Sequence, residues 1–284
     1  MPAADLRRHS IACHKGKKPV PPLVEPLFIL ALFEVFLVFF KKNYMAIQPW
    51  RTGKVIRIEN ETPGTRRFWI EVPDTAAFDF TPGQFVTLDL PIHEKVNKRW
   101  RSYSIASWPD NKNIFELVVV LLSGGAGSTY LFNEVGPGSE IQFRGPQGVF
   151  VLKEPDLQKD IFLICTGTGI APFRSMMHHI KNNNIPHQNM YLIFGTRTKK
   201  DLLYYEEFCQ LQKDLPGLQY LPTLSRDDWE GRRGYVHPVY EELCANKQPA
   251  GFFLCGWKDM IDEAKQRIMA LGYERKNIHQ ELYG

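Results

Sequence analysis

The chain has 284 residues, which is enough for two domains of ordinary size, and its 44% hydrophobic and 23% charged residues indicate a globular protein rather than a disordered one. A net charge of +4 at pH 7 would suit a nucleic-acid or membrane partner if it were spread along the chain. Residues 1–45 hold seven Lys and Arg but three Asp and Glu, which leaves 28 of the 35 basic and 28 of the 31 acidic residues to the remainder. The remainder is therefore neutral, and nucleic-acid binding is not expected.

The five cysteines are odd in number, are widely spaced and include no Cys-x-x-Cys pair: Cys13, Cys165, Cys209, Cys244 and Cys255. Secreted disulfide frameworks and structural zinc or iron–sulfur sites use paired or closely spaced cysteines. The sequence therefore predicts a reducing, cytoplasmic environment and no metal site.

An apolar segment near the amino terminus, residues 27–40, follows a lead rich in Lys, Arg and Pro that is expected to be disordered. As a helix this segment reaches only about 21 Å, against about 30 Å for the hydrocarbon core of a membrane. Lys41 and Lys42 follow directly, and no small-x-small cleavage site is present. Three interpretations of residues 1–45 stay open: an artefactual upstream extension with the start at Met45, a short membrane anchor, which we do not favour, and a signal peptide.

From Ile47 onward the sequence consists of short runs typical of β-strands, separated by turns rich in Pro and Gly. Six strands at this spacing predict an antiparallel β-barrel domain over residues 46–157. The expected strands are Lys54–Glu59, Arg67–Val72, Gln84–Leu90, Trp100–Ala106, Ile114–Leu122 and Glu140–Arg144.

Residues 158–284 instead alternate between strand-like and helix-like patterns. This alternation predicts an α/β domain with a parallel sheet, helices on both faces, and ligands at the carboxyl ends of the strands. The expected elements are strand Asp160–Cys165 with helix Ile170–Lys181, strand Met190–Gly195 with helix Lys200–Leu211, strand Gln219–Leu224 with helix Pro238–Cys244, strand Phe252–Cys255 with helix Lys258–Leu271, and a last strand Asn277–Leu282.

The fourth predicted barrel strand, followed to Ser107, combines an arginine, an aromatic ring and hydroxyls. Period two puts Arg101 and Tyr103 on one face and Ser102 and Ser104 on the other. A guanidinium can hold a pyrophosphate through paired hydrogen bonds, and the tyrosine ring can lie on an isoalloxazine. The pattern indicates a flavin site, although an ordinary half-buried strand with an exposed arginine has the same pattern.

A glycine-rich turn with Gly125 and Gly127 runs into a predicted helical segment, Ser128–Glu134. Bare backbone N–H groups at a helix start, with the hydroxyls of Ser128 and Thr129, are typical of an anion site. Taken alone the motif is weak, because glycines in a turn need no ligand.

A second glycine-rich turn follows the first strand of the α/β domain. Gly167, Thr168 and Gly169 allow a close approach to a pyrophosphate, and Pro172 suits a first helical turn because its φ is fixed and it has no N–H. Pro172 replaces the third glycine of the usual dinucleotide motif, which makes the motif less specific.

The other strand ends carry further candidates for contact with a nucleotide. Arg226, Arg232 and Arg233, near Ser225 and Tyr235, indicate a basic pocket with hydroxyls for a 2′-phosphate. Taken singly, each strand-end residue is better explained as a loop glycine or a solvated arginine. The strand-end candidates are Thr196 and Arg197 after the second strand, Ser225 and Arg226 after the third, and Cys255 and Gly256 after the fourth.

From about Trp50 to the carboxyl end, the ordered set of motifs resembles the ferredoxin–NADP reductase family of flavoproteins. The resemblance rests on Arg101-x-Tyr103-Ser104 as the flavin motif, Gly125-x-Gly127-Ser128 as a second phosphate motif, and Gly167-Thr168-Gly169-Ile170-Ala171-Pro172 as the NADPH pyrophosphate turn. It implies bound FAD, the use of NADPH with NADH as an alternative, and two domains of the kind predicted above.

The resemblance also implies roles for single residues. Ser225, Arg226, Arg233 and Tyr235 fall on 2′-phosphate positions, with Arg233 where plant-type members carry Lys, and Cys255-Gly256 falls on the nicotinamide-facing pair. Ser104 would hydrogen-bond near the reactive flavin nitrogen, and Glu281 would link Ser104 to solvent as a proton relay. Tyr283 would cover the flavin, but Gly284 follows it where plant-type members end.

The implied activity is hydride transfer between NADPH and FAD, with single electrons passed to a separate carrier protein such as ferredoxin or flavodoxin. Two alternatives stay open: an NADH-dependent reductase component of an oxygenase or cytochrome system, and a non-catalytic flavin-binding subunit. Lys95, Lys98 and Arg99, beside the flavin motif, predict a docking patch for an acidic carrier, although with Glu94 among them a solvated loop is equally consistent.

Overall fold

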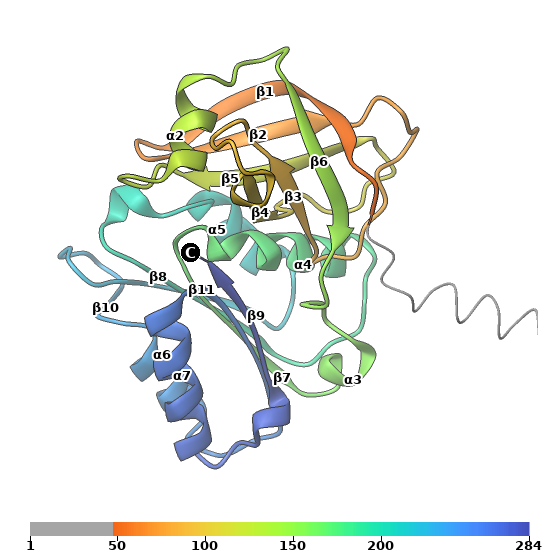
Figure 1. Cartoon of the computed structure of the whole chain (residues 1–284). Helices are drawn as coiled ribbons and strands as arrows, with labels where there is room; N and C mark the ends of the chain where they lie inside the picture. Colours follow the sequence, from red (N-terminus) through yellow and green to blue (C-terminus); the bar gives the residue numbers. More distant parts are fainter. Residues whose placement is uncertain (1–47, 284) are drawn as a thin grey trace, which may run out of the picture. The chain divides into compact units, whose positions relative to one another are not determined.

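The computed structural model describes residues 48–283, shown in colour in Figure 1. The expectations for residues 1–45, including the apolar segment 27–40, lie outside the described residues. Two six-stranded sheets, one after the other along the chain, make up the described part.

The first sheet is antiparallel and forms the predicted barrel. Its strand order is β4-β3-β6-β1-β2-β5, and the backbone N–H of Ala106, just after β4, donates to the carbonyl of Glu116 on β5 at 2.8 Å, which joins the two ends of that order. Phe68, Phe115 and Phe143 fill its interior. The strands are β1 (Arg51–Thr62), β2 (Thr65–Glu71), β3 (Phe85–Asp89), β4 (Trp100–Ser104), β5 (Ile114–Val120) and β6 (Glu140–Gln147). The antiparallel barrel is confirmed.

The second sheet is parallel throughout, with the order β10-β9-β8-β7-β11-β12. Its strands are β7 (Asp160–Thr166), β8 (Met190–Thr196), β9 (Leu218–Leu224), β10 (Arg232–Arg233), β11 (Ala250–Trp257) and β12 (Ile278–Tyr283). The order reverses between β7 and β11, so the helices that follow these two strands, α4 (Ala171–Asn182) and α7 (Lys258–Ala270), cover opposite faces of the sheet, and α/β sheets bind ligands at the carboxyl edge at such a point.

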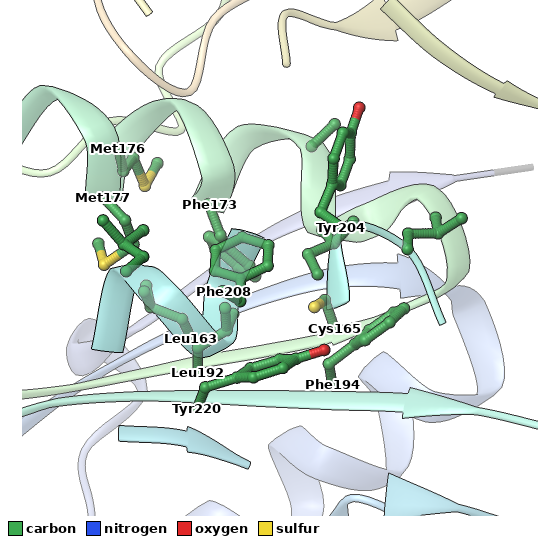
Figure 2. Packing of buried hydrophobic residues seen from close by; sticks show 14 of the residues in the cluster. Leu163, Cys165, Phe173, Met176, Met177, Leu192, Phe194, Tyr204, Phe208 and Tyr220 are labelled. Carbon is green, nitrogen blue, oxygen red and sulfur yellow. The ribbon is translucent and has the colours of Figure 1, made fainter. Parts of the chain in front are cut away.

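Helices cover both faces of the parallel sheet, as predicted. Within β7, Leu163 packs with α4 on the face toward the barrel, whereas Phe162 packs with α7 on the opposite face. Figure 2 shows the first of these clusters, with Phe173 and Met177 of α4 beside Leu163 of the sheet. The helices are α4 (Ala171–Asn182) and α5 (Tyr205–Asp214) on the barrel side, and α6 (His237–Leu243) and α7 (Lys258–Ala270) on the other.

The predicted helix Lys200–Leu211 is wrong in its first turn. A short 3-10 turn, η3 (Lys199–Asp201), is followed by Tyr204 in the left-handed region with φ of +53°, and α5 begins only at the next residue. The backbone N–H of Tyr204 donates to Glu61 of the barrel at 2.6 Å, so a tertiary contact interrupts the helix that the sequence pattern favours.

Several short elements were not predicted. The two-residue strand β10 is too short to show a periodicity, and the 3-10 turns η1 (Val96–Lys98), η2 (Gly167–Ile170) and η4 (Arg275–Asn277) are also short. Two short helices complete the fold, α2 (Ala126–Asn133) between β5 and β6 and α3 (Glu154–Leu157) between β6 and β7. The domain boundary at residues 157/158 stays a prediction.

Among residues 48–283, no helix has the length and apolar character needed to cross a membrane. The same part of the chain holds no group of three or more His, Cys, Asp or Glu that is arranged to bind a metal ion. Its cysteines Cys165, Cys209, Cys244 and Cys255 are all free.

Candidate active site

A groove of about 1620 Å³ runs along the carboxyl edge of the parallel sheet and the neighbouring strands of the barrel. Its volume exceeds the roughly 300–1,000 Å³ of sites for drug-sized ligands, so it has room for more than one nucleotide. The predicted site residues that line it are Arg101, Tyr103, Ser104, Gly125, Gly127, Ser128, Gly167, Thr168, Thr196, Arg197, Ser225, Tyr235, Gly256, Glu281 and Tyr283.

Five predicted site residues do not line the groove. Gly169, Pro172 and Cys255 are buried directly behind its wall, and Arg226 and Arg233 are exposed beyond its edge. Residues far apart in the sequence are thus brought together at one surface, while these five either support that surface or lie outside it.

The flavin motif on β4 contributes Arg101 and Tyr103. The guanidinium Nη1 of Arg101 donates to the carbonyl oxygens of Lys98 at 3.1 Å and Trp100 at 2.7 Å. A Cβ on Gly127 would lie 2.9 Å from Cγ of Arg101, so only glycine lets the arginine stem cross the start of α2. Burial raises the pKa of Tyr103 to about 12, against the opposing charge of Arg101, and the phenol stays neutral.

The turn before α2 uses its serine internally. Ser128 Oγ donates to the carbonyl of Gly125 at 3.0 Å and accepts from the N–H of Leu122 at 3.1 Å. The hydroxyl therefore stabilises the turn, and the N–H groups of the first turn of α2 are the donors that remain for an anion. The helix begins at Ala126, two residues earlier than predicted.

The turn after β7 presses against the end of β11. Gly167 has φ of +55°, and a Cβ on Gly169 would overlap the carbonyl oxygen of Cys255 and lie 2.7 Å from its carbonyl carbon. Gly256 has φ of +143°, and a Cβ there would lie 3.1 Å from the backbone nitrogen of Thr166. Glycine is therefore required for space as well as for conformation, because two backbones are in contact.

A hydrogen bond joins the barrel to the last strand across the groove. The hydroxyl of Ser104, only 3% exposed, donates to Oε1 of Glu281 on β12. Burial raises the pKa of Glu281, and the bond from Ser104 opposes that rise only in part. The two residues named as a proton relay are thus in direct contact.

Cys255 and Tyr283 lie on the same side of the sheet as Glu281. Cys255 pairs with Glu281, and Trp257 pairs with Tyr283, in the register of β11 and β12. Burial, followed by the nearby Glu281, raises the pKa of the Cys255 thiol well above its ordinary range. Burial likewise raises the pKa of Tyr283. Both groups are therefore neutral, and Cys255 has the character of a packing residue rather than a nucleophile.

The predicted 2′-phosphate pocket is partly neutralised by its own carboxylates. Arg233 forms an ion pair with Asp228, and Arg232 pairs with Glu242 at 2.7 Å. Within residues 48–283, Arg197 and Arg226 have no carboxylate at ion-pair distance, and the backbone N–H of Arg226 donates to the carbonyl of Arg197 at 2.9 Å. Arg197 within the groove and Arg226 beyond its edge are thus arginines whose charge no carboxylate in that part of the chain offsets.

Two tryptophans of the groove were missed by the sequence reasoning. Trp257, 48% exposed, follows Gly256 at the end of β11, and its backbone N–H donates to Thr166 Oγ1 at 3.4 Å. Trp100 precedes Arg101 on β4. The sequence could have indicated them by position, since each is an aromatic residue next to a motif residue at a strand end.

Two known domain families match the chain. The oxidoreductase FAD-binding domain covers residues 52–152, and the oxidoreductase NAD-binding domain covers residues 163–266. The chain belongs to the ferredoxin–NADP reductase family, as its 35% identity to one such reductase over 96% of that protein's length shows. It is a flavoenzyme of the oxidoreductase class with one domain for FAD and one for a nicotinamide coenzyme, in the order the motifs predicted.

Among similar proteins, ferredoxin–NADP reductase B of Sorangium cellulosum is 35% identical over 81% of this chain and 96% of its own length. The phenol hydroxylase P5 protein of Acinetobacter pittii is 30% identical over 81% of this chain but 64% of its own, so the chain spans less than two thirds of that relative.

Solved structures share the fold. A ferredoxin NADP+ reductase from Neisseria gonorrhoeae with bound FAD and NADP has a TM-score of 0.67 at 23% identity, covering 82% of this chain and 98% of that one. The FAD/NAD binding domain of a nitric oxide dioxygenase from Vibrio cholerae has a TM-score of 0.73 at 21% identity, again covering 82% and 98%.

The residues present suit both cofactors. The stem of Arg101 crosses a glycine at the start of α2, which brings a guanidinium beside bare N–H groups, and this is a donor set for the FAD pyrophosphate. The turn from Gly167 to Ile170 lies at the reversal point of the parallel sheet, where the pyrophosphate of a nicotinamide coenzyme would be held.

We expect Gly169→Ala to weaken coenzyme binding, because the new methyl group would meet the backbone of Cys255. Overpacking of this kind costs about 1–3 kcal/mol, or roughly ten- to hundredfold in affinity if the turn must shift. The dissociation constant for NADP+, from difference absorbance of the flavin, is the measurement. Gly136→Ala is the matched control, since nothing lies within 4 Å of its Cβ. Equal affinity for both variants would contradict the contact.

We expect Glu281→Gln to change how stability depends on pH. Because the folded pKa of Glu281 is raised above its ordinary 4.5, the folded protein holds this proton more tightly than the unfolded chain. Ionised Glu281 therefore costs stability increasingly as pH rises from its unfolded pKa through its folded one. The variant should gain melting temperature over the parent increasingly as pH rises above 4.5. Glu274→Gln, at an exposed position, should show no such trend. A constant difference for Glu281→Gln would refute the raised pKa.

Proposed function

We propose that the protein catalyses electron transfer between NADPH and a separate one-electron carrier protein. The strongest support is the single groove lined by both the flavin motif of β4 and the turn after β7, with Ser104 bonded to Glu281 between them. The chemistry that bound FAD would supply here is the acceptance of a hydride from the nicotinamide and the release of electrons one at a time.

The chain's own contribution is to bind and orient the reacting rings. Arg101 and the start of α2 hold one pyrophosphate, and the neutral ring of Tyr103 supports the flavin. The turn at Gly167 holds the second pyrophosphate, with Thr168 at its edge and Gly169 and Pro172 packing it against the sheet. Such positioning supplies a large part of the rate in hydride transfer.

Ser104 and Glu281 form the proton path. The raised pKa of Glu281 brings that carboxyl closer to neutral pH, where a proton can be gained or lost readily, and its contact with Ser104 extends the path to the flavin face. Cys255 and Gly256 form the wall against the nicotinamide. Tyr283, which also lines the groove, covers the flavin.

NADPH is the favoured coenzyme. Arg197, Arg226, Ser225 and Tyr235 gather after β8 and β9 and suit a 2′-phosphate, with Thr196 contributing its backbone to the pocket. Arg233 contributes less than the sequence indicates, because Asp228 offsets its charge.

Two alternatives remain. The second candidate is an NADH-dependent reductase component of an oxygenase or cytochrome system. Relatives named as oxygenase electron transfer components, such as that of 2-halobenzoate 1,2-dioxygenase from Burkholderia cepacia at 28% identity, support the oxygenase part of it. A non-catalytic flavin-binding subunit is disfavoured, since residues suited to both cofactors line one groove.

The carrier is an acidic protein such as ferredoxin or flavodoxin, which docks on Lys95 and Lys98 beside the flavin strand. Arg99 does not belong to this patch, because it pairs with Asp89 at 2.7 Å. A reducing, cytoplasmic location agrees with the free cysteines of the described part.

We expect the purified protein to be yellow and to be bleached by NADPH without oxygen. Arg101→Ala should bind FAD about ten- to hundredfold more weakly, since a charge-assisted hydrogen-bond pair contributes about 1.5–3 kcal/mol. Flavin retained after dialysis is the measurement. Arg57→Ala, at an exposed arginine stacked on Trp69, is the control and should keep its flavin. Retention by Arg101→Ala equal to that of the control would refute this role, and no bleaching of the parent would refute the activity.

We expect a higher kcat/KM for NADPH than for NADH. Arg226→Ala should raise the KM for NADPH by about tenfold, as one charged hydrogen-bond partner is lost, and barely change the KM for NADH. NADH is the internal control, because it has no 2′-phosphate. Equal use of both coenzymes by the parent would favour the second candidate.

We expect Lys95→Glu with Lys98→Glu to slow reduction of an acidic carrier severalfold and to leave ferricyanide reduction unchanged. Rising salt should slow the parent with the carrier, because the screening length falls from about 30 Å at 0.01 M to about 10 Å at 0.1 M. Lys112→Glu with Lys276→Glu, two exposed lysines that do not line the groove, is the charge-matched control. A loss with ferricyanide as well would mean damaged flavin chemistry instead of lost docking.

A further inference from the structure

One buried arginine joins the two sheets of the molecule. Arg174 lies in the first turn of α4 and is 4% exposed. Its Nε and Nη2 donate to the two carboxylate oxygens of Glu207 at 2.6 and 3.0 Å. Its Nη1 donates across to the barrel, to Oε2 of Glu116 at 3.0 Å and to the carbonyl of Ala106 at 2.9 Å.

Glu116 is the barrel's side of this contact and is itself only 2% exposed. It accepts from Nε and Nη2 of Arg67 at 2.6 and 3.2 Å and from the hydroxyl of Tyr204 at 2.9 Å. With Glu61, which pairs with Arg67 at 3.4 Å, two arginines and three glutamates share one cluster, and Arg174 and Glu116 are its buried centre. Such a cluster has a single arrangement in which every donor is satisfied, so it fixes geometry.

The two ends of the contact belong to the two halves of the groove. On one side, Arg174 stands two residues after Pro172, so it moves with the Gly167–Ile170 turn. On the other, Ala106 stands two residues after Ser104, and its N–H donates to the carbonyl of Glu116 at 2.8 Å. The hydrogen bonds of Arg174 to Glu116 and Ala106 therefore connect the Gly167–Ile170 turn to the flavin strand β4 over a short distance along the chain.

We propose that Arg174 is a positioning residue for hydride transfer, which fixes the coenzyme turn relative to the flavin strand through Glu116 and Ala106. The inference rests on the proposed function. A planar guanidinium meets three acceptors at set angles, whereas a lysine ammonium keeps the charge but not the fork. Misplacement by about 1 Å can slow a reaction by about a hundredfold, so a loosened turn shows in the transfer rate before it shows in affinity.

The test is Arg174→Lys in the full chain with FAD bound, mixed with NADPH without oxygen in a stopped-flow instrument. Hydride transfer at saturating NADPH should slow by about tenfold or more, with a larger isotope effect for NADPH deuterated at C4 of the nicotinamide. The dissociation constants for FAD and NADP+ should stay within about twofold of the parent's, and the long-wavelength absorbance of the NADP+ complex should weaken.

Arg51→Lys is the matched control, because Arg51 also holds a carboxylate, that of Asp74, but on the barrel away from the groove. Its transfer rate should equal the parent's. A lower unfolding midpoint for Arg174→Lys with the parental rate and isotope effect would make the residue merely structural and overturn the inference. A parent that NADPH does not reduce would overturn the proposed function and the inference with it.

Should Arg174→Lys fail to fold, Glu207→Gln gives a milder second test, since it weakens the outer fork of Arg174 and leaves the bond to Glu116. The transfer rate should fall severalfold while FAD and NADP+ affinities hold, and backbone amides of the Gly167–Ile170 turn should exchange faster with deuterium. Unchanged transfer and exchange would overturn the inference.

Discussion

The coenzyme side of the groove depends on contact between two backbones at the carboxyl edge of the parallel sheet. Gly169 faces the carbonyl of Cys255, and Gly256 faces Thr166, so neither position has room for a side chain. Because β7 and β11 are neighbours at the reversal of strand order, this contact fixes how closely the turn after β7 approaches the end of β11. The wall behind the coenzyme is thus backbone and cannot be altered by side-chain choice.

Burial of charge between the two sheets serves geometry more than stability. Removing Arg174 and Glu116 from water is costly, and pairing them roughly offsets that cost, whereas breaking such a pair costs about 3–5 kcal/mol. Burial alone would raise the pKa of Glu207, but the bonds and charges of His178 and Arg174 outweigh it and bring the pKa to about 2. The stabilisation from Glu207 is therefore complete above its unfolded pKa and is lost only as pH falls toward about 2.

The sheets and most helices could be predicted from the spacing of hydrophobic residues along the sequence, because each face of each element packs against one neighbour. The glycine turns and the flavin motif followed from chemistry that is local in sequence. The ion pairs could not be predicted from the sequence. Folding alone brings Arg99 to Asp89 and Arg233 to Asp228, and such pairs leave no periodic pattern along the chain. Arg174 sits singly among apolar residues of α4, where only its burial shows that it must have partners.

The groove separates charged ends from a neutral centre. Arg101 and Arg197 stand at the phosphate-binding parts, while burial raises the pKa of Tyr103, Cys255 and Tyr283 and keeps all three uncharged. Dinucleotides have the same pattern, with anionic phosphates joined to uncharged or weakly charged rings. An arrangement of this kind orients a cofactor before its ring makes any contact. Phosphates avoid the neutral wall, because leaving water there would cost free energy, and the arginines attract them. Among these neutral side chains stands Glu281, a carboxyl whose pKa burial raises and whose Oε1 accepts from Ser104, and this is why we propose it for the proton path.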